Sequence, residues 1–161
     1  MDFELRQAKA EDVGQLAYIM MLWRQELPPE SRFFGEEAWI AERAAQIAIF
    51  NPSYLTKVLM DGDKMIAESI TIKNDEGFFS PLPFGVLLSV YVKPEYRGHL
   101  LLGYKLLCDA VKSAKDMGMS RVEFNPMVND RGTALVLKRL GFKPICTTHF
   151  LELTDGKRLE S

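Results

Sequence analysis

Apolar and polar residues alternate at the start of the chain and then change to helical spacing. FELRQAK (residues 3–9) begins with apolar side chains at every second position, which predicts a strand at the edge of a sheet. In residues 10–27 the apolar positions lie three and four apart, which predicts a helix, and Pro28 and Pro29 end it. The same spacing predicts a second helix over residues 36–50.

The middle of the chain predicts three successive strands. YLTKVLM (54–60) and KMIAESITIK (64–73) flank Asp61-Gly62-Asp63, a sequence typical of a tight hairpin turn. A longer, apolar turn follows at 74–83, and FGVLLSVYV (84–92) is apolar on both faces. We therefore expect residues 84–92 to form a central strand that is covered on each side.

The second half of the chain completes a sheet with helices between its strands. The expected helix, strand, helix and two final strands cover 101–117, 120–125, 130–140, 142–146 and 148–153. The order β-α-α-β-β-β-α-β-α-β-β predicts an α/β fold, in which a mixed sheet of about seven strands carries helices on both faces. We expect one domain over residues 1–153 and a polar tail over 154–161.

The composition is that of an ordinary globular protein. Of the 161 residues 47% are hydrophobic, and 20 basic against 22 acidic residues leave a net charge of −2, so we expect no nucleic-acid partner. No apolar run approaches the ~18 residues of a membrane span, and the N-terminus lacks a secretory pattern. Cys108 and Cys146 have no metal-ligand or redox spacing, which indicates buried thiols in a reducing compartment. We expect a cytoplasmic protein without a membrane segment or a metal.

The stretch PEYRGHLLLG (94–103) joins the buried strand to an amphipathic helix. The free N–H groups and dipole at a helix N-terminus favour a phosphate at such a position. FGVLLSVYV, KPEYRG, a helix, RVEFN and a helix ending in KRLGF together resemble the GCN5-related N-acetyltransferase (GNAT) superfamily. This resemblance implies transfer of an acetyl group from acetyl-CoA, as co-substrate, to an amine-bearing acceptor by direct attack. It also implies that the loop grips the pyrophosphate of acetyl-CoA.

The resemblance further implies which residues contact acetyl-CoA. Val90 and Val92 would offer their main chain to the pantetheine arm. The full set implied is Val90, Tyr91, Val92, Arg97, Gly98, His99, Leu102, Gly103 and Asn129. The family's small loop residues fall on Leu100 and Leu102 here, unless a one-residue insertion places Gly103 at the second position. The alternatives are that Gly98 makes only a tight turn and that Asn129 only caps a helix.

Two carboxylates are candidate proton acceptors. A base helps the reaction because a free lysine, with a pKa of ~10.4, is almost wholly protonated at pH 7. Glu68 falls in phase with Ile66 and Ile70, and burial on such a face raises the pKa of a carboxyl towards neutrality. A salt bridge across the sheet is the alternative for Glu68. For Glu123, the alternative is a solvated ion pair with Arg121.

The clues to the acceptor are charge and an apolar turn. Acidic residues cluster in and between the first two predicted helices, which in the family form one wall of the acceptor site: Glu26, Glu30, Glu36, Glu37 and Glu42. A negative wall attracts an amine cation, and a solvated helix face is the alternative. The apolar turn at 74–83 would cover the acceptor mouth or form a homodimer contact.

Two functions remain open on the sequence. The first is the N-acetyltransferase that the resemblance implies. The second is a GNAT-like domain that has lost catalysis and serves as a protein-binding or structural module. The second arises because Leu100 and Leu102 replace the loop's small residues, while Leu137 stands where the family often has a tyrosine that protonates the departing thiolate.

Overall fold

The protein folds around a mixed sheet. The computed structural model describes residues 3–28, 37–75, 82–99, 101–124 and 131–143. The strands of these residues are β1 (Phe3–Gln7), β2 (Tyr54–Asp61), β3 (Lys64–Asn74), β4 (Phe84–Val92) and β5 (Val122–Phe124). They lie in the order β1-β2-β3-β4-β5, in which β4 and β5 are parallel and the other neighbours are antiparallel.

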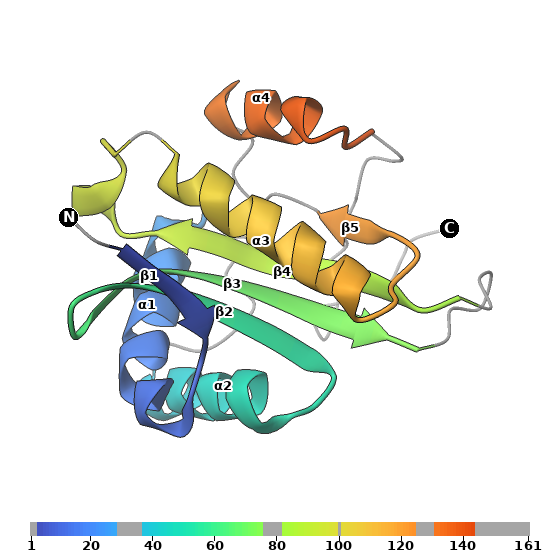
Figure 1. Cartoon of the computed structure of the whole chain (residues 1–161). Coiled ribbons are helices and arrows are strands. Elements are labelled where there is room, and N and C mark those ends of the chain that lie inside the picture. Colours follow the sequence, from blue (N-terminus) through green and yellow to red (C-terminus); the bar gives the residue numbers. More distant parts are fainter. Residues whose placement is uncertain (1–2, 29–36, 76–81, 100, 125–130, 144–161) are drawn as a thin grey trace, which may run out of the picture.

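Helices cover both faces of the sheet (Figure 1). They are α1 (Val13–Glu26), α2 (Ala38–Phe50), α3 (Leu102–Asp116) and α4 (Arg131–Arg139). Helices α1 and α2 pack together on one face, α3 packs on the other, and α4 lies beyond α3. Within the described ranges, no helix has the length and apolar character that crossing a membrane requires.

The mixed α/β fold predicted from the sequence is confirmed. Strand β1 lies at one edge of the sheet that the described strands form, as predicted, and Gly62, with φ of 58°, lies in the predicted hairpin turn. Gly118 follows the C-terminal end of α3 and has a φ of 77°, a conformation that glycine adopts without steric strain. Of the two final strands expected at 142–146 and 148–153, only residues 142 and 143 are described, and they form no strand.

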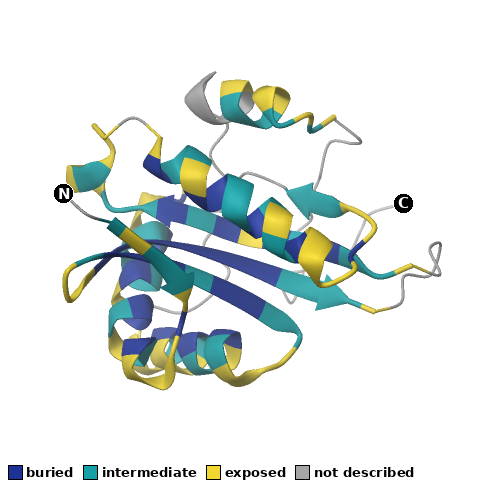
Figure 2. Cartoon of the chain, viewed as in Figure 1, coloured by how far each residue is buried: buried dark blue, intermediate teal, exposed yellow. Residues whose placement is uncertain are grey.

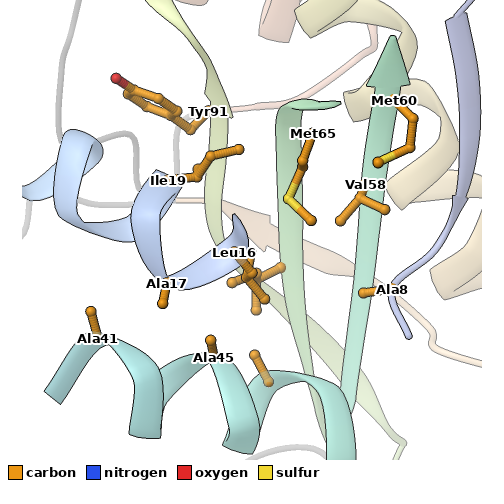
Figure 3. Packing of buried hydrophobic residues seen from close by; sticks show 12 residues of the cluster. Ala8, Leu16, Ala17, Ile19, Ala41, Ala45, Val58, Met60, Met65 and Tyr91 are labelled. Atoms are coloured by element: carbon orange, nitrogen blue, oxygen red, sulfur yellow. The ribbon is translucent and has the colours of Figure 1, made fainter. Parts of the chain in front are cut away.

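The core has one layer on each face of the sheet (Figure 2). On the α1/α2 face, Leu16 and Ile19 of α1 pack against Val58 and Met65 of the sheet (Figure 3). The small residues Ala41, Ala45 and Ala48 let α2 approach closely at the same cluster. On the other face, apolar side chains of α3 pack against β2, β3 and β4. Strand β3 is buried from Met65 to Thr71, so it is the deepest strand described.

An irregularity in β3 overturns one expectation about its faces. Leu59 pairs with Ala67 and Met60 with Met65, which leaves Ile66 as an extra residue between the pairs. Ile66 therefore packs on the α3 face with Leu59 and Leu106, while Met65 packs on the α1 face. The prediction that Ile66 shares a face with Glu68 is wrong, because strict alternation does not survive an inserted residue.

Candidate active site at the open edge of β4

Strand β4 is paired with β5 over only part of its length. The parallel pairing joins Gly85, Val86 and Leu87 to Val122, Glu123 and Phe124. Beyond Leu87, β4 continues to Val92, and no strand of the described residues pairs with that edge. We call the stretch 88–92 the open edge of β4. Its main-chain groups are ready to bind an extended ligand as a strand would.

A bulge at Leu88 determines which main-chain groups face outward. Ile70 pairs with Ser89 and Thr71 with Leu87, so Leu88 is an extra residue in β4. The Gly85 N–H donates towards β5, to the Arg121 carbonyl, whereas the Lys93 N–H donates towards β3, to the Ile66 carbonyl. Regular alternation would send residues 85 and 93 to the same edge.

The bulge reverses that alternation in the second half of β4. Because the Lys93 N–H faces β3, the N–H and C=O groups of Val92 and Val90 face the open edge. These are the two residues whose main chain the sequence assigns to the pantetheine arm. The cofactor contact itself remains a prediction.

The connection from β4 to α3 uses some of its N–H groups internally. A 3₁₀ turn covers Pro94–Tyr96, after which the Arg97 N–H donates to the Pro94 carbonyl and the His99 N–H to the Tyr96 carbonyl. Within the described part of the chain, the N–H groups of Gly98, Gly103 and Tyr104 have no hydrogen-bond acceptor. Gly98 and Gly103, rather than Arg97 and His99, therefore offer free main-chain donors.

The leucines of this connection have different conformations. Leu101 precedes α3 with φ of 97° and leaves its side chain 66% exposed. Leu102 is buried against Leu106 and Ala67, so it is a core residue. The strained backbone thus lies at Leu101, between Leu100 and Leu102, the two positions that correspond to the family's small loop residues. Leu100 itself falls outside the described residues. The first turn of α3 retains free N–H groups and a positive dipole end, which suit an anion.

Arg97 links this connection to the end of α1. Its Nε donates to the Val92 carbonyl at 2.8 Å, and its Nη2 donates to both carboxylate oxygens of Glu26, at 2.8 and 2.7 Å. The Tyr91 hydroxyl donates to Glu26 Oε1 at 2.7 Å, and the guanidinium lies 5.1 Å from the centre of the Tyr91 ring. Burial and the bond to Glu26 raise the pKa of Tyr91. No local pattern connects residues 71 positions apart, so sequence reasoning missed this cluster.

Glu68 is a buried carboxyl beside the open edge. Its side chain is 1% exposed, and in the register of the sheet it lies between Val58 and Tyr91, both on the α1 face. The Ser89 hydroxyl donates to Glu68 Oε2 at 3.1 Å. Burial raises the pKa of Glu68 to about 8, against a smaller lowering by the Ser89 bond. The raised pKa agrees with the expectation from its apolar surroundings, and the described residues give Glu68 no ion pair.

Glu123 lies apart from this group. Its Oε1 accepts from Arg121 Nη2 at 2.8 Å, the ion pair that was the alternative reading of the sequence. It borders a hollow of about 660 Å³ next to Val111 and Phe142, around the C-terminal half of α3. The open edge lies towards the other end of α3, so this hollow does not coincide with the candidate site.

Other sequence-predicted residues are only partly placed. Asn129, Glu30 and Glu36 lie outside the described residues, as do residues 76–81 of the apolar turn. Leu137 is partly buried and packs against the cluster that includes Leu87 and Leu107, so the position of the family's tyrosine holds an apolar contact here. In the described ranges, no three His, Cys, Asp or Glu side chains gather as a metal site would require.

Comparison with known proteins finds one family. The model of the acetyltransferase (GNAT) family matches residues 17–142. No curated protein sequence matches the chain.

Solved structures agree with this match at the level of the fold. An acetyltransferase of Trypanosoma brucei is 18% identical, with 94% of this chain and 100% of that chain covered at a TM-score of 0.72. A glucosamine-6-phosphate N-acetyltransferase from Arabidopsis thaliana is 15% identical, with 96% and 100% covered at 0.71. A predicted acetyltransferase from Clostridium acetobutylicum, solved with acetyl-CoA, is 18% identical, with 95% and 96% covered at 0.70.

The strained backbone at Leu101 predicts a stabilising substitution. Leu101→Gly removes a left-handed leucine, so we expect the free energy of unfolding to rise by about 1 kcal/mol. For a chain of this size that corresponds to a rise in Tm of roughly 2–4 °C, measured by thermal unfolding. Leu101→Ala keeps a Cβ at the same φ and should give no such gain. Equal stabilisation by both variants would mean that the exposed side chain, and not the backbone, is responsible.

Proposed function

Because the chain belongs to the acetyltransferase (GNAT) family, we propose that it transfers the acetyl group of acetyl-CoA to a primary amine. The acceptor would be a small molecule, a peptide or a protein. The observation that carries this proposal is the open edge of β4, where the bulge at Leu88 turns the main chain of Val90 and Val92 outward. This edge leads directly to the N-terminus of α3, so an extended ligand with an anionic end matches both features.

The co-substrate fits these groups by chemistry and direction. The amides of the pantetheine arm would pair with the outward N–H and C=O groups of Val90 and with the Val92 N–H, because Arg97 already occupies the Val92 carbonyl. The diphosphate would accept from the free N–H groups of Gly98, Gly103 and Tyr104 at the helix N-terminus. A Cβ atom added at Gly98 would have no neighbour within 4 Å, so there is room for an anion beside its backbone.

Direct attack needs a neutral amine and a place for its proton. The amine nitrogen would form a bond to the thioester carbonyl carbon, and the carbon–sulfur bond would break with release of the CoA thiolate. A thiol pKa of ~8.5 lets the thiolate leave without an acid, which suits a site whose tyrosine position is Leu137. The amine's proton would pass to the Ser89 hydroxyl as Ser89 passes its own proton to Glu68.

The acceptor itself is proposed only by class. Glu37 and Glu42 are exposed at the N-terminal end of α2, where they favour a cationic amine. Glu26 adds little to this attraction because Arg97 neutralises it. A cytoplasmic setting fits the free thiol of Cys108. The acceptor can be identified by mass spectrometry of a lysate that has been acetylated with the protein and acetyl-CoA.

Titration with acetyl-CoA tests the enzyme against the alternative of a GNAT-like domain that has lost catalysis. We expect acetyl-CoA at 100 times its Kd to stabilise the protein by about 2.7 kcal/mol, measured as a saturable rise in Tm. Gly98→Trp should abolish the rise while leaving the unliganded Tm nearly unchanged, since a side chain at Gly98 enters open space. No shift with millimolar acetyl-CoA would sink the proposal.

Glu68→Gln tests the proton path. The amide keeps the shape and accepts the Ser89 bond but takes no proton, so kcat should fall by about 10²–10⁴-fold with little change in the Kd for acetyl-CoA. In the wild type the rate should rise with pH through about 8, where Glu68 ionises. The inflection should disappear in the variant. Glu123→Gln is the matched control, and an equal loss of kcat there would remove the special role of Glu68.

The pH dependence of stability checks the state of Glu68 without any substrate. Its pKa is raised from 4.5 to about 8 on folding, so the folded state holds a proton that the unfolded state releases between these values. Wild-type stability should therefore include a contribution that is complete below pH 4.5 and lost as the pH rises to 8. Denaturant unfolding of Glu68→Gln should lack this loss. Parallel curves for the two proteins would mean that Glu68 is ionised when folded.

A further inference from the structure

The contacts of Arg97 point to a role for Glu26 that the family match does not assign. We propose that Glu26 is a positioning residue, which holds Arg97 as a strut between the end of α1 and the connection from β4 to α3. In this arrangement Arg97 shapes the diphosphate-binding main chain and is not itself the ligand of the diphosphate. The inference rests on the proposed function, since the ligand concerned is acetyl-CoA.

Contacts to one edge and to one face of the Arg97 guanidinium determine its orientation. The edge formed by Nε and Nη2 donates to the Val92 carbonyl and to the Glu26 carboxylate. One face of the guanidinium plane lies over the Tyr91 ring. A guanidinium bound in this way has little freedom to turn towards another anion without losing several contacts together.

Glu26 is held as firmly as the arginine that it binds. The Tyr91 hydroxyl donates to the same carboxylate oxygen that accepts from Arg97 Nη2. Tyr91 is anchored in turn, because its ring is buried in the cluster between α1 and the sheet (Figure 3). The carboxylate therefore joins the last residue of α1 to both β4 and the connection that follows it.

The charge balance also argues against a direct phosphate contact. An arginine that binds an anionic ligand usually has no carboxylate partner in the unliganded protein, whereas Arg97 already forms an ion pair with Glu26. The pair is half-exposed, so each contact alone is modest, and the effect comes from the network. What the network fixes is the path of the backbone from Val92 to Gly98, immediately before the free N–H groups at the start of α3.

Calorimetric titration with acetyl-CoA distinguishes a strut from a phosphate ligand. Glu26→Gln and Arg97→Lys should each weaken binding by about 3- to 10-fold, because the amide loses the charge and lysine loses the two-point fork. The double variant should bind acetyl-CoA no more weakly than whichever single variant binds it less tightly, because both substitutions disrupt the same Glu26–Arg97 contact. Glu11→Gln, which removes an exposed charge beside the opposite end of α1, should bind like the wild type. Each variant's Tm, measured without ligand, confirms that it is folded.

Other outcomes overturn the inference. If Arg97 bound the diphosphate, Glu26→Gln would free it and tighten binding, and Arg97→Lys would retain most of the affinity by charge. Unchanged binding in both single variants, or losses that add in the double variant, would also contradict the strut. A wild-type protein that does not bind acetyl-CoA would instead contradict the proposed function, and this inference with it.

Discussion

The extra residue at Leu88 is the constraint on which the candidate site depends. Without it, the main chain of β4 would present the same alternation from Gly85 to Lys93, and Val90 and Val92 would direct their polar groups towards β3. With it, one half of the strand pairs with β5 and the other half offers a free edge beside the start of α3. A single inserted residue therefore decides which residues, Val90 and Val92 rather than Ser89 and Tyr91, present their main chain at the open edge.

The charged groups around the edge are arranged by the same geometry. Ser89 and Tyr91 alternate with Val90 and Val92, so their side chains project onto the α1 face while the valine backbones face outward. Glu68 is reached through Ser89, and Glu26 through Tyr91. One carboxylate is buried with a raised pKa, and the other is half-exposed and paired with an arginine. Two acidic residues next to one strand thus have different chemistry because their surroundings differ.

Much of the fold was predictable from local patterns, since alternation, helical spacing and glycines at turns act within a few residues. The strand at 84–92 and the hairpin around Gly62 follow from such signals. The bulges at Ile66 and Leu88 do not, because an inserted apolar residue looks like its neighbours until the partner strand sets the register. The pair of Glu26 and Arg97 depends on how α1 is placed, and nothing near either residue encodes it. The left-handed backbone at Leu101 runs against the conformational preference of leucine, so the residue types around it give no sign of it.

The central claim is that the open edge of β4 and the start of α3 together bind acetyl-CoA. A crystal structure with acetyl-CoA tests this most directly, because it locates every contact of the co-substrate. The account predicts main-chain hydrogen bonds from the pantetheine arm to Val90 and Val92 and a diphosphate on the N–H groups of Gly98, Gly103 and Tyr104, with Arg97 still on Glu26. A co-substrate bound away from this edge, for example in the hollow beside Val111 and Phe142, would contradict it.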